Sequence, residues 1–259
     1  MKTAGSGYIR VDLQRAFCTW RMPFAIIGIC LFFLYNSEKT DAVTWVSSIG
    51  SVAVLVMGAL MLAIYPYGAA FCDDMEYRYD RQLMIRKGSF SYVCSKMLAV
   101  FVSSAAAMFA GFFIPVLILM YKYGAPNEDA VEMLVDCQGW YCQFVVQGQY
   151  IRYFICAGLQ IASLAGTLAV IGLTCSLFVR NRMLVYILPI AIMYIEDIMV
   201  QRFWGWEKGS TFSLRSMGIT TLEVPLKGQS WQLYYFEIFM VLLCAGAIAY
   251  WKTERRIRN

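Results

Sequence analysis

Histidine is absent from all 259 residues of this chain. Its absence excludes zinc sites of the HExxH kind, Ser–His and Cys–His nucleophile pairs, and ligation of haem iron by histidine. No GxxxxGK[ST] loop occurs either, so the chain has no phosphate-cradling loop of its own. The usual constellations of soluble enzymes are therefore missing. We expect the chain itself to be non-catalytic and to hold no metal and no cofactor.

Charge is also scarce: 15% of the residues are charged and 60% are hydrophobic. A soluble domain is usually about a quarter charged and about half apolar. Several apolar runs approach or exceed the roughly 20 residues that a transmembrane helix needs. The net charge of +5 fits positive cytoplasmic loops better than a nucleic-acid partner. The composition therefore predicts an all-α integral membrane protein.

We expect six transmembrane helices in one membrane domain that covers residues 1–259. The predicted ranges are 22–36, 43–71, 93–121, 153–179, 183–200 and 231–251. At 1.5 Å per residue the second range would be about 44 Å long, which exceeds a hydrocarbon core of about 30 Å. This helix would therefore tilt or project from the membrane.

The distribution of basic residues predicts the orientation. If both termini are cytoplasmic, the inner segments hold 15 of the 22 lysines and arginines, as the positive-inside rule requires. The polar stretch from Glu76 to Lys96 then faces the cytoplasm, and we expect a multi-pass protein of a bacterial cytoplasmic membrane. Within 153–179, Gly158, Ala162 and Gly166 form a small-residue stripe that could pack helices within the chain or between chains.

Residues 73–86 predict a short amphipathic helix on the cytoplasmic side. Acidic residues occupy its first turn and basic residues its last, which complements the helix dipole, and Gly88 follows as a suitable C-cap. Met75, Tyr79 and Leu83 recur every four residues as an apolar stripe. Two interpretations stay open: a polar turn on the lipid surface, or a docking helix that a soluble partner grips.

From Glu76 through RQLMIRKGSFSYVCSKML the chain resembles the permease of type-2 ATP-binding-cassette (ABC) transporters. The shared pattern is an acidic residue, a leucine-rich short helix, a turn with basic residues, and an aromatic residue and a lysine that open the next helix. Here Tyr92 and Lys96 match that last element, whereas Tyr77 and Arg78 stand where the family often has Gly-Thr. The resemblance implies a coupling helix that inserts into an ATPase subunit. The coupling residues would be Glu76, Tyr79, Arg81, Leu83, Arg86, Lys87 and Gly88.

The resemblance also implies the function and the partners. The chain would export an amphipathic substrate (a peptide antibiotic, a lipid or a drug-like molecule) with the help of a separate soluble ATPase that holds ATP and Mg. A second permease chain, identical or related, would complete the transporter, and membrane lipid would surround it. Two alternatives remain: an ATP-independent channel or scaffold, and an intramembrane enzyme built on paired acids.

Three acidic residues at predicted membrane depth are candidates for the substrate pathway: Glu196, Asp197 and Glu237. They could instead reach the outer interface or pair with Arg202. Cys137 and Cys142 are the only cysteines in predicted outer segments, and they could form a small-loop disulfide.

Residues 10–21 carry basic side chains and Trp20, which suits a helix that lies in the lipid headgroup layer. In the permease family that the chain resembles, such a helix braces the transmembrane domain. The alternative is simple anchoring of the first span.

Overall fold

The computed structural model describes residues 4–35, 41–49, 53–76, 88–124, 131–132, 141–179, 181–204, 213–219 and 231–258. All regular structure within these ranges is helical, which confirms the predicted all-α class. The helices are α1 (Ala4–Phe17), α2 (Arg21–Tyr35), α3 (Ala42–Ser48), α4 (Ala53–Ile64), α5 (Ala70–Glu76), α7 (Ser89–Tyr123), α9 (Cys142–Val146), α10 (Tyr150–Cys175), α11 (Arg182–Trp204), α13 (Leu214–Ile219) and α14 (Trp231–Arg258).

Four of these helices, α7, α10, α11 and α14, are long and apolar enough to cross a membrane. A fifth span results if Ile9–Phe17 and Arg21–Tyr35, which meet at a bend of 53°, count as one. Four to five such helices fit a multi-pass membrane protein. The number six and the orientation stay predictions.

The expected long helix over 43–71 is interrupted. Within that range the described chain forms α3, α4, a turn over 65–69 and the beginning of α5. Pro66 lies in the turn, where its missing N–H costs no helical hydrogen bond. The Gly68 N–H donates to the carbonyl of Ile64 at 2.9 Å. The apolar composition predicted a membrane-embedded segment but not these breaks.

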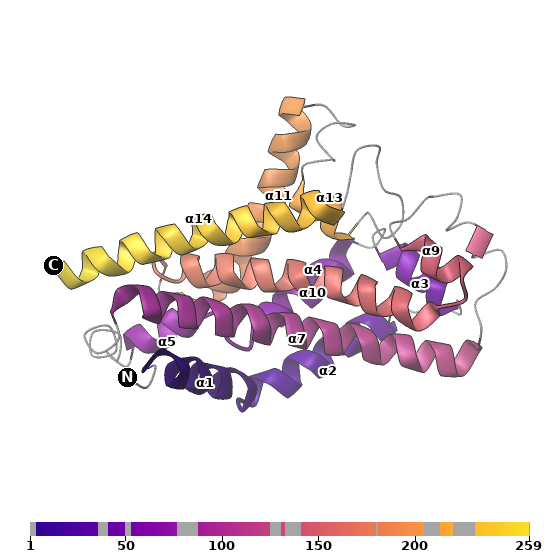
Figure 1. Ribbon diagram of the computed structural model, residues 1–259, viewed down its shortest axis with the longest axis horizontal. Helices are drawn as coiled ribbons and strands as arrows, with labels where there is room; N and C mark the ends of the chain where they lie inside the picture. The colour runs from indigo at the N-terminus through magenta and orange to yellow at the C-terminus, as the bar shows by residue number, and fades with distance from the viewer. Residues whose placement is uncertain are drawn as a thin grey trace.

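Helices α7, α10 and α14 run alongside one another along the long axis of the molecule (Figure 1). Gly158 and Gly166 of α10 let α7 approach closely: a Cβ at Gly166 would lie 2.8 Å from the Phe101 ring of α7. The small-residue stripe therefore packs helices within the chain. On the other side of α7, a Cβ at Gly111 would lie 2.6 Å from Ile29 of α2.

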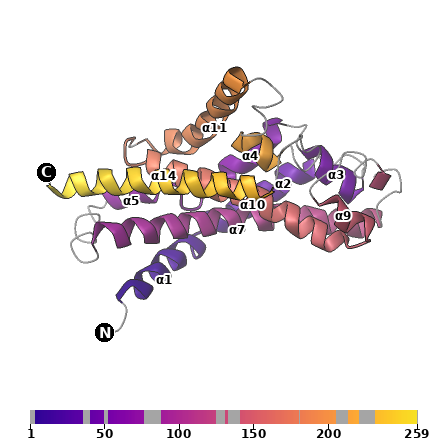
Figure 2. The same ribbon diagram turned by 45° about the horizontal axis from the view of Figure 1, so that its top comes forward.

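Helix α11 diverges from this bundle in both views (Figures 1 and 2). Its first half packs on α10, where a Cβ at Gly172 would lie 3.1 Å from Pro189 and 3.2 Å from the carbonyl oxygen of Val185. Its second half exposes apolar side chains, including Ile195 and Phe203. That surface suits lipid or another apolar helix.

Both termini lie at one end of the molecule, where α5 and the beginning of α7 are also found (Figure 1). Which side of a membrane this end faces stays a prediction. We call it the terminal end. Two polar networks lie there.

Candidate functional site: the polar networks at the terminal end

Lys96 is the centre of the first network. Its ammonium group lies 3.0 Å from Asp74 of α5, 3.3 Å from Asp12 of α1 and 2.8 Å from the hydroxyl of Tyr67. The lysine side chain is only 1% exposed, although it comes from the second turn of α7. One side chain therefore joins α1, α5 and α7.

Each carboxylate of this network has a further partner on α7. The Tyr92 hydroxyl donates to Asp74 at 2.6 Å, and the Ser95 hydroxyl donates to Asp12 at 2.6 Å. The spacing of Tyr92, Ser95 and Lys96 explains this, because residues three and four apart share one face of a helix. The α7 face thus supplies a cation and two hydroxyl donors to two incoming carboxylates.

Because this network is buried, the stability of the surrounding helices depends on how well its charges are paired. Removing charges from water costs several kcal/mol for each ion, and only close and fully hydrogen-bonded partners offset that cost. Lys96 also lies 5.0 Å from the centre of the Tyr67 ring, within reach of a cation–π contact. One ammonium group and two carboxyl groups thus meet in this buried network.

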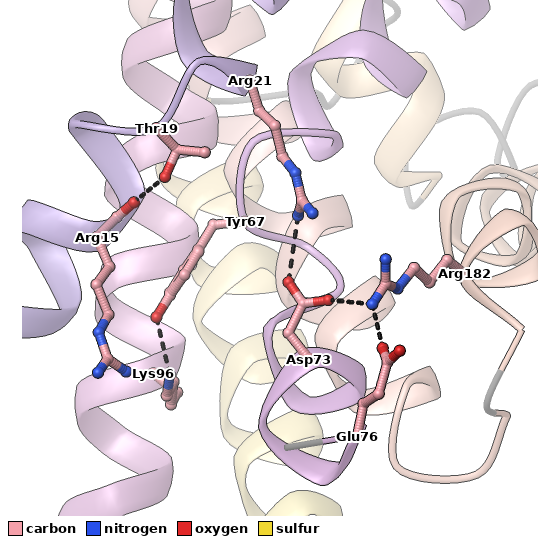
Figure 3. Close-up of polar contacts among 8 residues, drawn as sticks. All are labelled: Arg15, Thr19, Arg21, Tyr67, Asp73, Glu76, Lys96 and Arg182. Atoms are coloured by element: carbon pink, nitrogen blue, oxygen red, sulfur yellow. Dashed lines mark hydrogen bonds and ion pairs between the residues drawn. The ribbon is translucent and has the colours of Figure 1, made fainter. Parts of the chain in front are cut away.

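The second network surrounds Asp73, the residue before Asp74. Asp73 lies between Arg21 of α2, at 3.2 Å, and Arg182 of α11, at 3.0 Å (Figure 3). Arg182 also pairs with Glu76 at the end of α5. These side chains are about a quarter to two-thirds exposed, so water and salt screen them more strongly than the Lys96 network.

Adjacent residues of α5 therefore face two different partners. Asp74 points to Lys96 and Tyr92 of α7, whereas Asp73 and Glu76 point to α2 and α11. The thiol of Cys72 adds a weak contact to the Val179 carbonyl at 3.5 Å. Burial raises the pKa of this thiol, and the negative charge of Asp73 raises it further. α5 is thus bound directly to α7, α2 and α11, and through Lys96 to α1.

The predicted coupling residues flank or follow this anchored helix. Glu76 is its last residue and pairs with Arg182. Gly88 is the N-cap of α7. Its φ of 75° is a conformation that favours glycine. Tyr79, Arg81, Leu83, Arg86 and Lys87 lie outside the described residues, and their coupling role stays a prediction.

Asp197, a predicted pathway residue, is buried in an ion pair. Arg215, which follows the start of α13, donates to its carboxylate at 2.6 Å, Ser213 donates at 2.6 Å, and Gln201 donates at 3.0 Å. The sequence suggested Arg202 as the partner, but that side chain is exposed. The structure thus assigns Asp197 to a contact that fixes α13 on α11.

Glu196 lies on α11 and Glu237 on α14. Both are half-buried, and the backbone N–H of Leu214 hydrogen-bonds to Glu196. The structure therefore separates the predicted trio: Asp197 is paired with Arg215, whereas Glu196 and Glu237 are half-buried on two different helices. Asp197 of the adjacent acid pair is engaged by Arg215, and the enzyme alternative stays untested.

Cys142 begins α9, but Cys137 lies outside the described residues, so their disulfide stays a prediction. Within the described ranges, no group of three or more Cys, Asp or Glu side chains is placed to hold a metal ion.

Sequence reasoning missed three partners in these sites: Asp12 and Tyr67 beside Lys96, and Arg215 beside Asp197. Asp12 and Lys96 are 84 positions apart, so no helical spacing links them. The available signal was a lysine near the start of a long apolar helix, because such a charge needs a partner at membrane depth.

Comparison with known proteins gave no relative: no family model, no curated protein and no solved structure matches this chain.

Proposed function

We propose that this chain is the membrane-spanning permease subunit of an ABC-type exporter, which a separate soluble ATPase drives. The ATPase would bind ATP and Mg, and a second permease chain would complete the translocation path. The substrate would be amphipathic, with a membrane-active peptide as the first choice. The motif between Glu76 and Lys96, together with four to five long apolar helices, supports this proposal.

The observation that carries the proposal is the anchoring of α5. A coupling segment must transmit a movement of its soluble partner to the membrane helices. The residues on either side of the segment therefore have to be fixed to those helices. Here the helix before 77–87 is tied to α1 and α7 through Lys96, and to α2 and α11 through Asp73. The residue after that segment opens α7 directly. A displacement of 77–87 would therefore reach four helices at once.

The first experiment is a pull-down of the tagged chain from membranes in mild detergent, followed by mass spectrometry. We expect a soluble protein with a GxxxxGK[ST] loop in a one-to-one ratio. Recovery of the chain alone, under conditions in which a reference ABC complex stays intact, would contradict the proposal and favour the channel or scaffold alternative.

Two single substitutions separate docking from internal packing. Glu76→Arg should release the ATPase or uncouple its activity from transport. Because Glu76 also pairs with Arg182, the matched control is Arg182→Gln, which removes the same internal pair and leaves Glu76 in place. If Arg182→Gln uncouples as strongly as Glu76→Arg, Glu76 acts only inside the chain. If only Glu76→Arg uncouples, a partner contacts Glu76.

A further inference from the structure

Helix α1 has one face fixed to the bundle and one face without a partner among the described residues. Asp12 and Ala16 are buried on the fixed face. The opposite arc is exposed and mixes basic, apolar and neutral polar side chains: Arg10, Val11, Gln14, Arg15, Phe17 and Cys18. Asp12 is the only acidic residue of α1, so the exposed arc carries positive charge alone.

The angle of α1 directs this arc away from the bundle. Residues 9–17 meet α2 at a bend of 53°, and Figure 2 shows α1 leaving the bundle obliquely at the terminal end. The Thr19 hydroxyl caps the helix by donating to the Arg15 carbonyl (Figure 3). Trp20 lies at the corner with 82% of its surface exposed. Tryptophan at the end of a membrane helix is typical of the headgroup layer.

A second basic element lies at the same end. The last turns of α14 carry Lys252 and Arg255, and both cations lie near aromatic rings. Lys252 is 4.9 Å from the centre of the Phe178 ring, and the Arg255 guanidinium is 5.4 Å from that of Trp251. α1 and the last turns of α14 lie at the same end of the molecule in both views, with α7 between them (Figures 1 and 2). Aromatic rings with cations beside them are expected where apolar lipid gives way to charged headgroups.

We propose that Arg10, Arg15, Trp20, Lys252 and Arg255 form a surface that binds anionic phospholipid headgroups. Guanidinium groups match phosphodiester oxygens in charge and geometry, and the interleaved apolar side chains fit the acyl boundary. A soluble partner would leave Trp20, Phe17 and Val11 beside a charged protein surface, whereas a lipid surface covers both kinds of side chain. This inference does not depend on the transport proposal.

Lipid bound at this surface would also stabilise the packing of α1 against α7. The buried face of α1 supplies Asp12 to Lys96, while the exposed face would hold headgroups. Lipid bound there would favour the conformation in which α1 stays docked. Anionic lipid should therefore raise the thermal stability of the whole chain, since any ligand that binds only the native state stabilises it.

The test measures lipid enrichment. The full chain is reconstituted into vesicles of phosphatidylcholine with about 30 mol % phosphatidylglycerol, re-extracted in mild detergent, and its retained lipids are quantified by mass spectrometry. We expect enrichment of phosphatidylglycerol. The variant Arg10→Gln/Arg15→Gln should lower the affinity by about 30-fold, whereas Arg10→Lys/Arg15→Lys should retain most of it.

The matched control removes two exposed charges from other places, Lys122 and Arg152. If Lys122→Gln/Arg152→Gln loses as much phosphatidylglycerol as the α1 variant, the proposal is wrong, because the effect is one of net charge. Equal enrichment in wild type and the α1 variant would also overturn it. If the α1 variant keeps its lipid but loses a co-purifying soluble protein, α1 is a protein-docking surface instead.

Discussion

Replacing Lys96 by methionine tests whether the buried network holds the terminal end together. Methionine keeps the length and the apolar stem of the side chain and removes its charge. Asp12 and Asp74, previously 3.3 and 3.0 Å from the ammonium group, would be left as buried carboxylates without a cation. Breaking a buried pair from one side costs about 3–5 kcal/mol. The hydrogen bonds from Ser95 and Tyr92 remain, so we expect a value near the lower limit.

Single removal of an acid should be milder. Asp12→Asn leaves Lys96 with Asp74 and Tyr67, so we expect a loss of about 1–2 kcal/mol. The triple variant Asp12→Asn/Asp74→Asn/Lys96→Met removes all three charges, and it should regain most of the stability that the single lysine substitution loses. This recovery is the signature of uncompensated charge, as opposed to lost packing volume.

The assay is reversible unfolding by sodium dodecyl sulfate in mixed micelles, followed by tryptophan emission. Lys122→Met is the control on the same helix, because Lys122 is exposed near the other end of α7 and should change stability by less than about 0.5 kcal/mol. The reasoning is refuted if Lys96→Met unfolds like wild type. It is also refuted if the triple variant is as unstable as the single one.

Two further predictions concern packing and the contact between α11 and α13. Gly111→Ala should destabilise the chain by about 1–3 kcal/mol, because its Cβ meets the helix that packs across it. Gly246→Ala should be close to neutral, since its nearest neighbour is a flexible methionine end at 3.3 Å; equal loss in both variants would contradict this. Arg215→Gln should cost about 1–3 kcal/mol and free the α13 segment for limited proteolysis, and an unchanged cleavage pattern would oppose this assignment.

The sequence was sufficient for features that depend on local composition. Long apolar runs predicted the helices now described as α7, α10, α11 and α14, because a run of that length has few alternatives. The interruption of 43–71 was not predictable in detail, since apolar composition alone does not show where a helix breaks. Pro66 was a marker of irregularity, but a proline inside a membrane helix is compatible with a kink or a turn.

The sites were harder to predict because their partners are distant in sequence. Asp74 belongs to the acidic turn that the sequence predicted, but its burial against Lys96 was not predicted. For Asp197 the sequence suggested Arg202, yet the pairing crosses to Arg215. Local spacing could not give these partners, because burial of a charge is decided by how helices assemble.

The Lys96 network is more deeply buried than the network around Asp73, and from this difference we predict how α5 moves. The side chains of Lys96 and Asp74 are buried, whereas those of Arg182 and Asp73 are partly exposed and their pairing is screened by salt. Opening should therefore begin between α5 and α11 and expose Cys72, which is buried there against the Ser176 and Val179 carbonyls. We would measure alkylation of a variant that keeps Cys72 as its only cysteine, with exposed Cys18 as the sole cysteine of the control.

The Arg182→Gln variant distinguishes opening from simple electrostatics. The positive charge of Arg182 lowers the pKa of Cys72, against burial and Asp73, which raise it. If the closed state reacted, losing Arg182 would raise the pKa further, reduce the thiolate fraction and slow alkylation. If α5 opens, losing Arg182 weakens the contact and accelerates alkylation of Cys72 severalfold, with Cys18 unchanged. Slower alkylation would show that α5 does not open on the side that faces α11.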